Sequence, residues 1–179
     1  AKKADEMVNS NGGNWGYVLV PYNVKDYELT KWTSFFEVLN KKHLIPIIQL
    51  WDVDIEDYKK QTDKATEFLT KLPWPIKKKY ISVYNEMNDP NFFNGGANPE
   101  LYSRILDFTI SAFKKTDSNY FIMNGAFNST APNTNGYFDQ EVFMGKMNEE
   151  VPGIFKKLDG WASHSYPNPD YIGSPNGLG

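Results

Sequence analysis

The 179-residue chain contains no cysteine, only two histidines and no long apolar run. The lack of cysteine excludes disulfides, thiol nucleophiles and thiolate metal sites, and leaves the cellular compartment open. No segment approaches the roughly 18 consecutive apolar residues of a membrane span, so we expect no membrane association. We identify no signal peptide, and the first residue is Ala rather than Met, which suggests a processed, trimmed or fragmentary chain.

Several motifs that would carry a cofactor or a nucleophile are also missing. No GxGxxG or Walker pattern follows the first expected strand, which argues against dinucleotide and nucleotide binding. There is no HExxH motif, and His43 and His164 lie too far apart in sequence to indicate catalytic zinc. No GxSxG elbow indicates a serine triad. A run of four acidic residues resembles part of a calcium loop but lacks its turn glycine and its bidentate Glu: Asp52, Asp54, Glu56 and Asp57. We therefore expect no cofactor and no metal.

Charge is mildly acidic and aromatic residues are abundant. With 19 basic and 22 acidic residues the formal net charge is −3, and the basic stripe typical of nucleic-acid binders is not expected. Aromatic residues make up 16% of the chain, and many lie beside Gly, Asn or Pro rather than inside apolar periods. Rings on loops can stack on sugars or bases, whereas core packing is the ordinary explanation for most of them.

Expected strands and helices alternate along the chain. Short apolar runs predict strands at 15–21, 44–51, 80–84, 120–126 and 161–166, and apolar residues at helical spacing predict helices within 29–39, 55–72, 99–113 and 138–148. Residues 1–11 are expected to be the end of an earlier helix. The strands recur about every 30 to 40 residues, the length of a βα unit, so the fold class is α/β with a parallel sheet. Such a sheet either closes into a barrel or opens into a doubly wound fold.

Polar and aromatic residues lie at the carboxyl end of every expected strand, which is where the reactive groups of α/β proteins lie. In chain order they are Tyr22 and Asn23; Gln49, Trp51, Asp52 and Asp54; Asn85 and Glu86; Asn124 and Asn128; His164 and Tyr166. Amides, carboxylates, one His and aromatic rings at five successive strand ends indicate a polyhydroxylated ligand. Asn128 also begins an Asn-Ser-Thr glycosylation pattern, which is too common to count without further context.

Two of these strand ends are the most informative. A carboxyl group such as Glu86 at the lip of an apolar barrel is partly desolvated, which favours a general acid, although a helix cap or salt bridge is the alternative. Asn85 beside it could hold a sugar hydroxyl. His164 and Tyr166 are two residues apart on a strand, so both point to one face, here the barrel interior, where His164 could tune a neighbouring carboxylate. A core histidine bonded to a backbone carbonyl is the alternative.

The order of elements, the pair Asn85-Glu86 followed by Asn88 and Pro90, and the segment His164-Ser165-Tyr166 resemble the retaining (β/α)8-barrel glycosidases. These enzymes carry their general acid/base in an Asn-Glu pair that ends strand four, and a His or Tyr after strand six contacts the nucleophile. The SHSYPNP segment is also similar to uncharacterised bacterial glycosidase-like proteins. The resemblance runs from about strand two to just past strand six. It therefore implies that residues 1–179 form an incomplete TIM-type barrel domain with five parallel strands.

The resemblance implies a carbohydrate partner and a set of roles. It makes Glu86 the acid/base, Asn85 the hydroxyl-binding amide, and His164 and Tyr166 supports of the second carboxylate. By position, other side chains are expected to line or rim the sugar cleft: Trp51, Tyr22, Asn128, Phe92 and Phe93. Polymeric glycans are mostly outside cells, which favours export.

The second carboxyl group is the missing part. The family's nucleophile is a Glu that ends strand seven, and this sequence has no matching position. Retaining hydrolysis needs two carboxyl groups about 5–5.5 Å apart and inverting hydrolysis roughly 6.5–9.5 Å. Within the chain the possible partners are Asp52, Asp54, Asp89 and Asp170. A carbohydrate-binding barrel without catalysis therefore stays open as a second hypothesis. An aldolase or isomerase would need a strand-end Lys or a phosphate-binding Gly loop, and we find neither.

Overall fold

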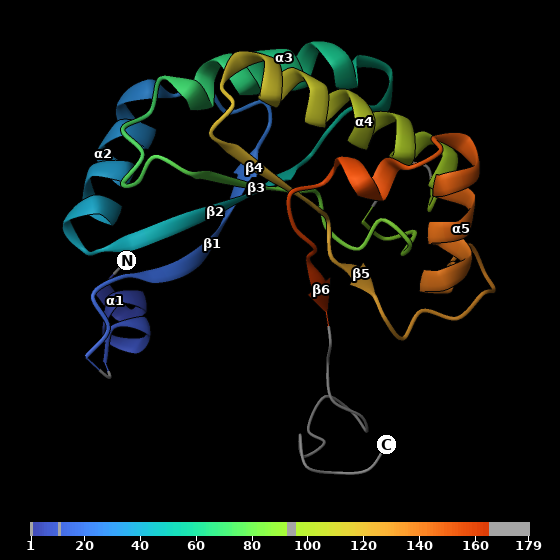
Figure 1. Cartoon of the computed structure of the whole chain (residues 1–179), viewed down its shortest axis with the longest axis horizontal. Coiled ribbons are helices and arrows are strands. Elements are labelled where there is room, and N and C mark those ends of the chain that lie inside the picture. The colour runs from blue at the N-terminus through green and yellow to red at the C-terminus, as the bar shows by residue number, and fades with distance from the viewer. Residues whose placement is uncertain (1, 11, 93–95, 165–179) are drawn as a thin grey trace.

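The computed structural model describes residues 2–10, 12–92 and 96–164 of the chain. A short helix, α1 (Lys2–Val8), precedes a sheet of four parallel strands: β1 (Gly16–Asn23), β2 (Leu44–Trp51), β3 (Lys79–Val83) and β4 (Tyr120–Asn124). The strands lie side by side in chain order. Three helices connect them and lie along one side of the sheet (Figure 1): α2 (Leu29–Lys41), α3 (Tyr58–Thr70, after the 3-10 turn Ile55–Asp57) and α4 (Pro99–Thr116). No described helix is long and apolar enough to cross a membrane.

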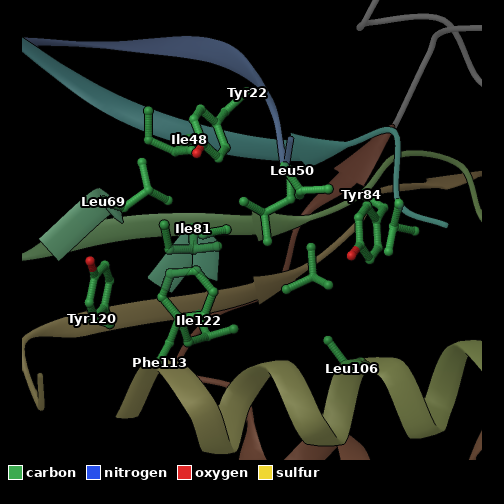
Figure 2. Packing of buried hydrophobic residues seen from close by; sticks show 14 of the residues in the cluster. Tyr22, Ile48, Leu50, Leu69, Ile81, Tyr84, Leu106, Phe113, Tyr120 and Ile122 are labelled. Carbon is green, nitrogen blue, oxygen red and sulfur yellow. The ribbon is translucent and has the colours of Figure 1, made fainter. Parts of the chain in front are cut away.

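The face of the sheet toward these helices forms the core. Register places Val20, Ile48, Ile81 and Ile122 in one row across the four strands, and all four are buried. Helix residues such as Leu69 and Phe113 pack over this row (Figure 2). The continuous apolar character of the strands therefore follows from burial under a helical layer, as a parallel sheet requires.

The opposite face, which we call the concave face, is apolar but only partly covered. Its central row is Leu19, Ile47, Tyr80 and Phe121, in register across the same strands. Leu19 is 52% exposed, and Tyr17 on the same strand is 53% exposed with its hydroxyl 3.3 Å from that of Tyr80. In a (β/α)8 barrel this face of the strands points to the barrel interior, where side chains stack in layers.

After β4 the chain again alternates a strand, a helix and a parallel strand. A two-stranded parallel pair, β5 (Phe127–Asn128) and β6 (Ser163–His164), brackets helix α5 (Gln140–Glu150) and the 3-10 turn Ile154–Lys157. A parallel bridge between Met123 and Gly160 joins the last segment to β4. A Cβ on Gly160 would lie 2.6 Å from the Phe121 ring, so a side chain at this position would require that ring to shift.

Strands β1 and β3 differ from the sequence prediction by one or two residues, and the last two expected strands differ more. The expected strand 120–126 ends at Asn124, because Gly125 donates its N–H to the Tyr102 hydroxyl (2.9 Å) and β5 starts separately. Within the described residues, the expected strand 161–166 has only Ser163 and His164 in a ladder. Before it, the Asn124 side chain replaces the backbone ladder by bonding both the N–H and the carbonyl of Ala162.

The α/β class, the parallel sheet and the sequential strand order are thus confirmed, and the architecture is a partial TIM-type barrel. The helix boundaries follow from local sequence. Pro99 occupies the first turn of α4, and the Asn98 side chain caps it by accepting the N–H of Leu101 at 2.8 Å.

Candidate functional site

The backbone after β3 is strained where it presents Glu86. Tyr84 has a φ of +69° and Glu86 a φ of +45°, the left-handed region that non-glycine residues seldom adopt. Each such residue costs on the order of 1–3 kcal/mol and persists only where surrounding contacts hold it. One of these contacts is the hydrogen bond from the Glu86 N–H to the Ala126 carbonyl at 2.8 Å. Strain of this kind is concentrated at functional sites.

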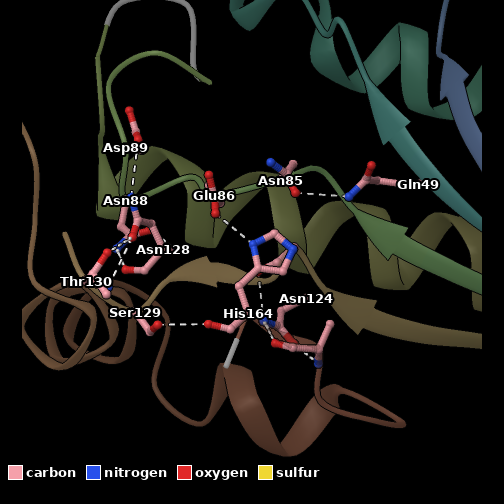
Figure 3. Close-up of polar contacts among 12 residues, drawn as sticks. Gln49, Asn85, Glu86, Asn88, Asp89, Asn124, Asn128, Ser129, Thr130 and His164 are labelled. Atoms are coloured by element: carbon pink, nitrogen blue, oxygen red, sulfur yellow. Dashed lines mark hydrogen bonds and ion pairs between the residues drawn. The ribbon is translucent and has the colours of Figure 1, made fainter. Parts of the chain in front are cut away.

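The Glu86 carboxyl group is shielded and paired with a histidine. Its side chain is 13% exposed, and Oε1 lies 2.7 Å from Nδ1 of His164, which is 21% exposed (Figure 3). Either a protonated carboxyl donates to a neutral ring, or the ring N–H donates to the carboxylate. The two residues are 78 positions apart and reach each other from the ends of β3 and β6. His164, expected to support a second carboxylate, thus contacts Glu86 itself.

Asn85 is oriented by the neighbouring strand. Its Oδ1 accepts a hydrogen bond from Nε2 of Gln49 at 3.1 Å. Gln49 belongs to β2 and its side chain lies on the concave face, in one row with Ser82. Because this bond accounts for Oδ1, the Asn85 Nδ2 is the atom that can donate to a ligand hydroxyl. The strand-end position of Gln49 was visible in the sequence, but its contact with Asn85 was not.

A buried amide fixes the loop that follows Glu86. The Asn88 side chain is fully buried and donates to the carbonyls of Asn128 (2.8 Å) and Phe138 (3.0 Å), while its Oδ1 accepts the Asn128 N–H (2.9 Å). Every bond ties this loop to β5 or to the segment before α5. Buried amides satisfied in this way rigidify what they join. Asn88 was part of the motif in the sequence, but its tethering role depends on tertiary contacts.

Asn128 belongs to the hydrogen-bond network around Asn88. Its Oδ1 accepts from the N–H and hydroxyl of Thr130, and its Nδ2 donates to Asp89 at 3.4 Å. The amide oxygen and nitrogen are thus both engaged, next to Asn88 (Figure 3). Its expected contact with sugar stays a prediction.

A pocket of about 260 Å³ opens beside Asn85, between the ends of β2 and β3. Its lining includes two of the expected cleft residues, Trp51 and Phe92, together with Asp52, Val53, Tyr84, Asn85, Met87 and Asn91. Tyr22 does not line this pocket, and the prediction that it lines the sugar cleft is wrong. The Tyr22 ring is fully buried among Trp32 and Phe68, and its hydroxyl donates to the Asp26 carbonyl. Phe93 and Tyr166 lie outside the described residues.

The candidate partner carboxylates bind their own neighbours. Asp52 accepts from Asn23 (2.8 Å) and lies 3.4 Å from the Lys25 ammonium. Hydrogen bonds from Lys25 and Gln61 hold the pKa of Asp54 below its usual value. Asp89 accepts from the backbone and side chain of Asn91 (2.9 and 2.8 Å). Asp170 lies outside the described residues. Across residues 2–10, 12–92 and 96–164, none of these carboxylates is bonded to Glu86, and no group of three or more acidic or histidine side chains is placed to hold a metal.

Comparison with known proteins shows the fold. No protein-family model matches the chain, and no curated protein matches it in sequence. Among solved structures, the chain is similar to the GH53 catalytic domain of Ignisphaera aggregans, with a TM-score of 0.57 and 17% identity. The match covers 91% of this chain and 51% of that one, so the chain spans about half the length of that domain. The likeness is to a glycoside hydrolase barrel, which agrees with the partial TIM-type architecture.

Proposed function

We propose that this chain carries the acid/base part of a glycoside hydrolase site, with Glu86 as general acid and base. The observation that carries the proposal is the Glu86–His164 pair, which is largely shielded from water and in which Glu86 follows β3 on strained backbone. The barrel architecture and its likeness to a glycoside hydrolase domain support it.

In the first step the protonated Glu86 carboxyl donates its proton to the glycosidic oxygen as the bond to the anomeric carbon breaks. The leaving sugar thereby departs as a neutral alcohol. In the same step the anomeric carbon forms a bond to the second carboxylate, which is expected from the resemblance at the end of a seventh strand. In the second step the Glu86 carboxylate removes a proton from the water that attacks the anomeric carbon, the bond to the second carboxylate breaks, and both carboxyl groups return to their starting states. His164 keeps Oε1 in one place through the 2.7 Å contact. The Asn85 amide holds a hydroxyl of the sugar through Nδ2.

The nucleophilic carboxylate is expected, from the resemblance, at the end of a seventh strand. Among the described residues no carboxylate takes that place, since Asp52, Asp54 and Asp89 are engaged with their own neighbours. The second candidate function is a carbohydrate-binding barrel that does not hydrolyse its ligand.

The experiment is made in a protein that contains this chain together with the strand expected to carry the nucleophile, and it compares Glu86→Gln with the parent on two substrates that differ in leaving group. On an oligosaccharide, whose leaving alcohol needs a proton, we expect a loss of at least about 100-fold in kcat. On a dinitrophenyl glycoside, whose leaving group needs little protonation, the loss in bond cleavage is smaller. Glu141→Gln, an exposed position on α5, is the matched control and keeps the parent rates.

Equal losses on both substrates, or parental rates for Glu86→Gln, would contradict the acid/base role. A parent chain that binds oligosaccharides but hydrolyses neither substrate would favour the binding barrel instead.

A further inference from the structure

The pocket beside Asn85 lies next to Glu86 in sequence, where it could bind a sugar unit adjacent to the one at Glu86. Tyr84, Asn85 and Met87 line it, so it borders Glu86 along the chain on both sides, and Trp51 brings it to the end of β2. A ligand that reaches from Glu86 into this pocket therefore runs along the strand ends from β3 toward β2. Its volume of about 260 Å³ lies just under the roughly 300–1,000 Å³ of drug-sized ligand pockets, which suits one sugar ring better than a long chain.

Two aromatic rings that line this pocket are not packed against other aromatic rings of the described chain, unlike most of its large rings. Trp51 is 48% exposed and Phe92 is 52% exposed, and in the described part of the chain neither packs on another aromatic ring. By contrast, Trp32 is buried and packs edge-on against Tyr22 and Phe35. Flat apolar faces of this kind suit the C–H faces of a sugar ring, and their edges leave its hydroxyls to polar neighbours.

The polar groups at this site favour a neutral ligand. Asp52 supplies carboxylate oxygens that can accept further hydrogen bonds from hydroxyls, beyond those from Asn23 and Lys25. The Lys25 ammonium also lies 2.8 Å from Asp54, so one ammonium is shared by two carboxylates. A sugar that carries a carboxylate or sulfate would be repelled by this surplus of negative charge.

We propose that this pocket is a subsite that binds one neutral sugar unit of an oligosaccharide, stacked on Trp51 and Phe92. The unit lies next to the one whose glycosidic bond Glu86 protonates, so this inference rests on the proposed function and makes its substrate a neutral oligomer. Asp52 and the Asn85 amide hold the hydroxyls of the bound ring.

The test measures binding, not turnover. Calorimetric titration of the full Glu86→Gln chain uses β-1,4-linked oligosaccharides of glucose, galactose and mannose, each up to six units long, with oligogalacturonate as the anionic comparison. We expect at least one neutral oligomer to bind and the anionic one to bind more weakly. Adding Trp51→Ala or Phe92→Ala should weaken that binding by about 5- to 10-fold, whereas Trp51→Phe retains most of it.

Trp15→Ala is the matched control, because Trp15 is 40% exposed and stacks on His43 ahead of β1, at the opposite end of the sheet. Equal losses in Trp15→Ala and Trp51→Ala, tighter binding of the anionic oligomer, or no binding of any neutral oligomer at millimolar concentration would each overturn the subsite. The kinetic comparison at Glu86 tests the proposed function separately, because it depends on leaving-group chemistry, whereas the titration measures affinity in a chain that lacks the acid.

Discussion

Side-chain alternation along a strand decides which strand-end residues reach the site. Trp51 and Gln49 share the side of β2 that forms the concave face, and both belong to the site or its support. Tyr22 shares its side of β1 with Val20, which faces the helices, so its ring lies in the core. The sequence predicted a strand-end position for Asn85 and Glu86, and both follow β3 in the structure. It could not locate the contact with His164, since no local pattern specifies which side chains meet across 78 positions.

Gly125 gives a prediction at this scale. A Cβ at this position would lie 2.6 Å from the Val83 carbonyl oxygen and 2.7 Å from that of Tyr84, both of them backbone atoms that cannot move aside cheaply. We expect Gly125→Ala to lower the free energy of unfolding by roughly 2–4 kcal/mol, because the ends of β3 and β4 must separate. Urea denaturation measures the change.

Gly145 is the matched control for that substitution. It lies inside α5 with no atom within 4 Å of an added Cβ. Gly145→Ala should therefore stabilise the chain by about 0.5–1 kcal/mol through helix propensity. If both substitutions had the same effect, the close approach at Gly125 would not limit stability.

Whole elements were predicted well where the pattern was long, and poorly where a tertiary contact set the boundary. The four sheet strands and helices α2, α3 and α4 lie where apolar runs and helical spacing placed them. The separate strand β5 was not expected, because it depends on the interruption at Gly125, which is held by a hydroxyl from α4. The weaker pattern at 138–148 still gave α5, which Asp139 caps by accepting two backbone N–H groups.

An ion pair that joins two elements should make stability depend on acid. Lys79 at the start of β3 lies 2.8 Å from Asp117 at the end of α4, and both side chains are largely shielded. The hydrogen bond from Lys79, with bonds from Asn119, lowers the Asp117 pKa from 3.8 to about 2. A lowered pKa in the folded state stabilises the fold above pH 4, and this contribution is lost as the pH falls toward 2.

We therefore expect Asp117→Asn to be less stable than the parent at pH 6, with the difference shrinking between pH 4 and pH 2. Urea midpoints across that range measure it. Asp107→Asn on the same helix removes a more exposed pair with Lys157 and is the control, for which a much smaller difference is expected. A constant difference for Asp117→Asn at all pH values would assign the effect to packing instead.

At the scale of the molecule, one face of the sheet is buried under the helices and the other is partly exposed. The helices bury the row of Val20, Ile48, Ile81 and Ile122, while Leu19 and Tyr17 remain half exposed on the concave face. Exposed apolar side chains that lie next to one another promote association. Parallel sheets are usually covered on both faces, and the described residues cover this sheet fully on one.

Neighbouring residues of β1 test this assignment. Leu19→Ser should change the free energy of unfolding by less than about 1 kcal/mol and reduce self-association, because the side chain is 52% exposed. Val20→Ser should cost about 2 kcal/mol or more, because it places a hydroxyl in the core and leaves a cavity there. Chemical denaturation and light scattering measure the two effects. Comparable destabilisation by both variants would contradict the distinction between the faces.

One phenol on α4 sets the spacing of the loops that carry the site. The Tyr102 hydroxyl donates its single hydrogen to the Val83 carbonyl at 2.8 Å and accepts the Gly125 N–H at 2.9 Å. It thus bridges the ends of β3 and β4 just where the strand ladder stops, since the last ladder pair is Val83 with Asn124. If α4 rotated slightly, the loops after β3 and β4 would therefore move together and their separation would be kept. Glu86 would then keep its position relative to Ala126.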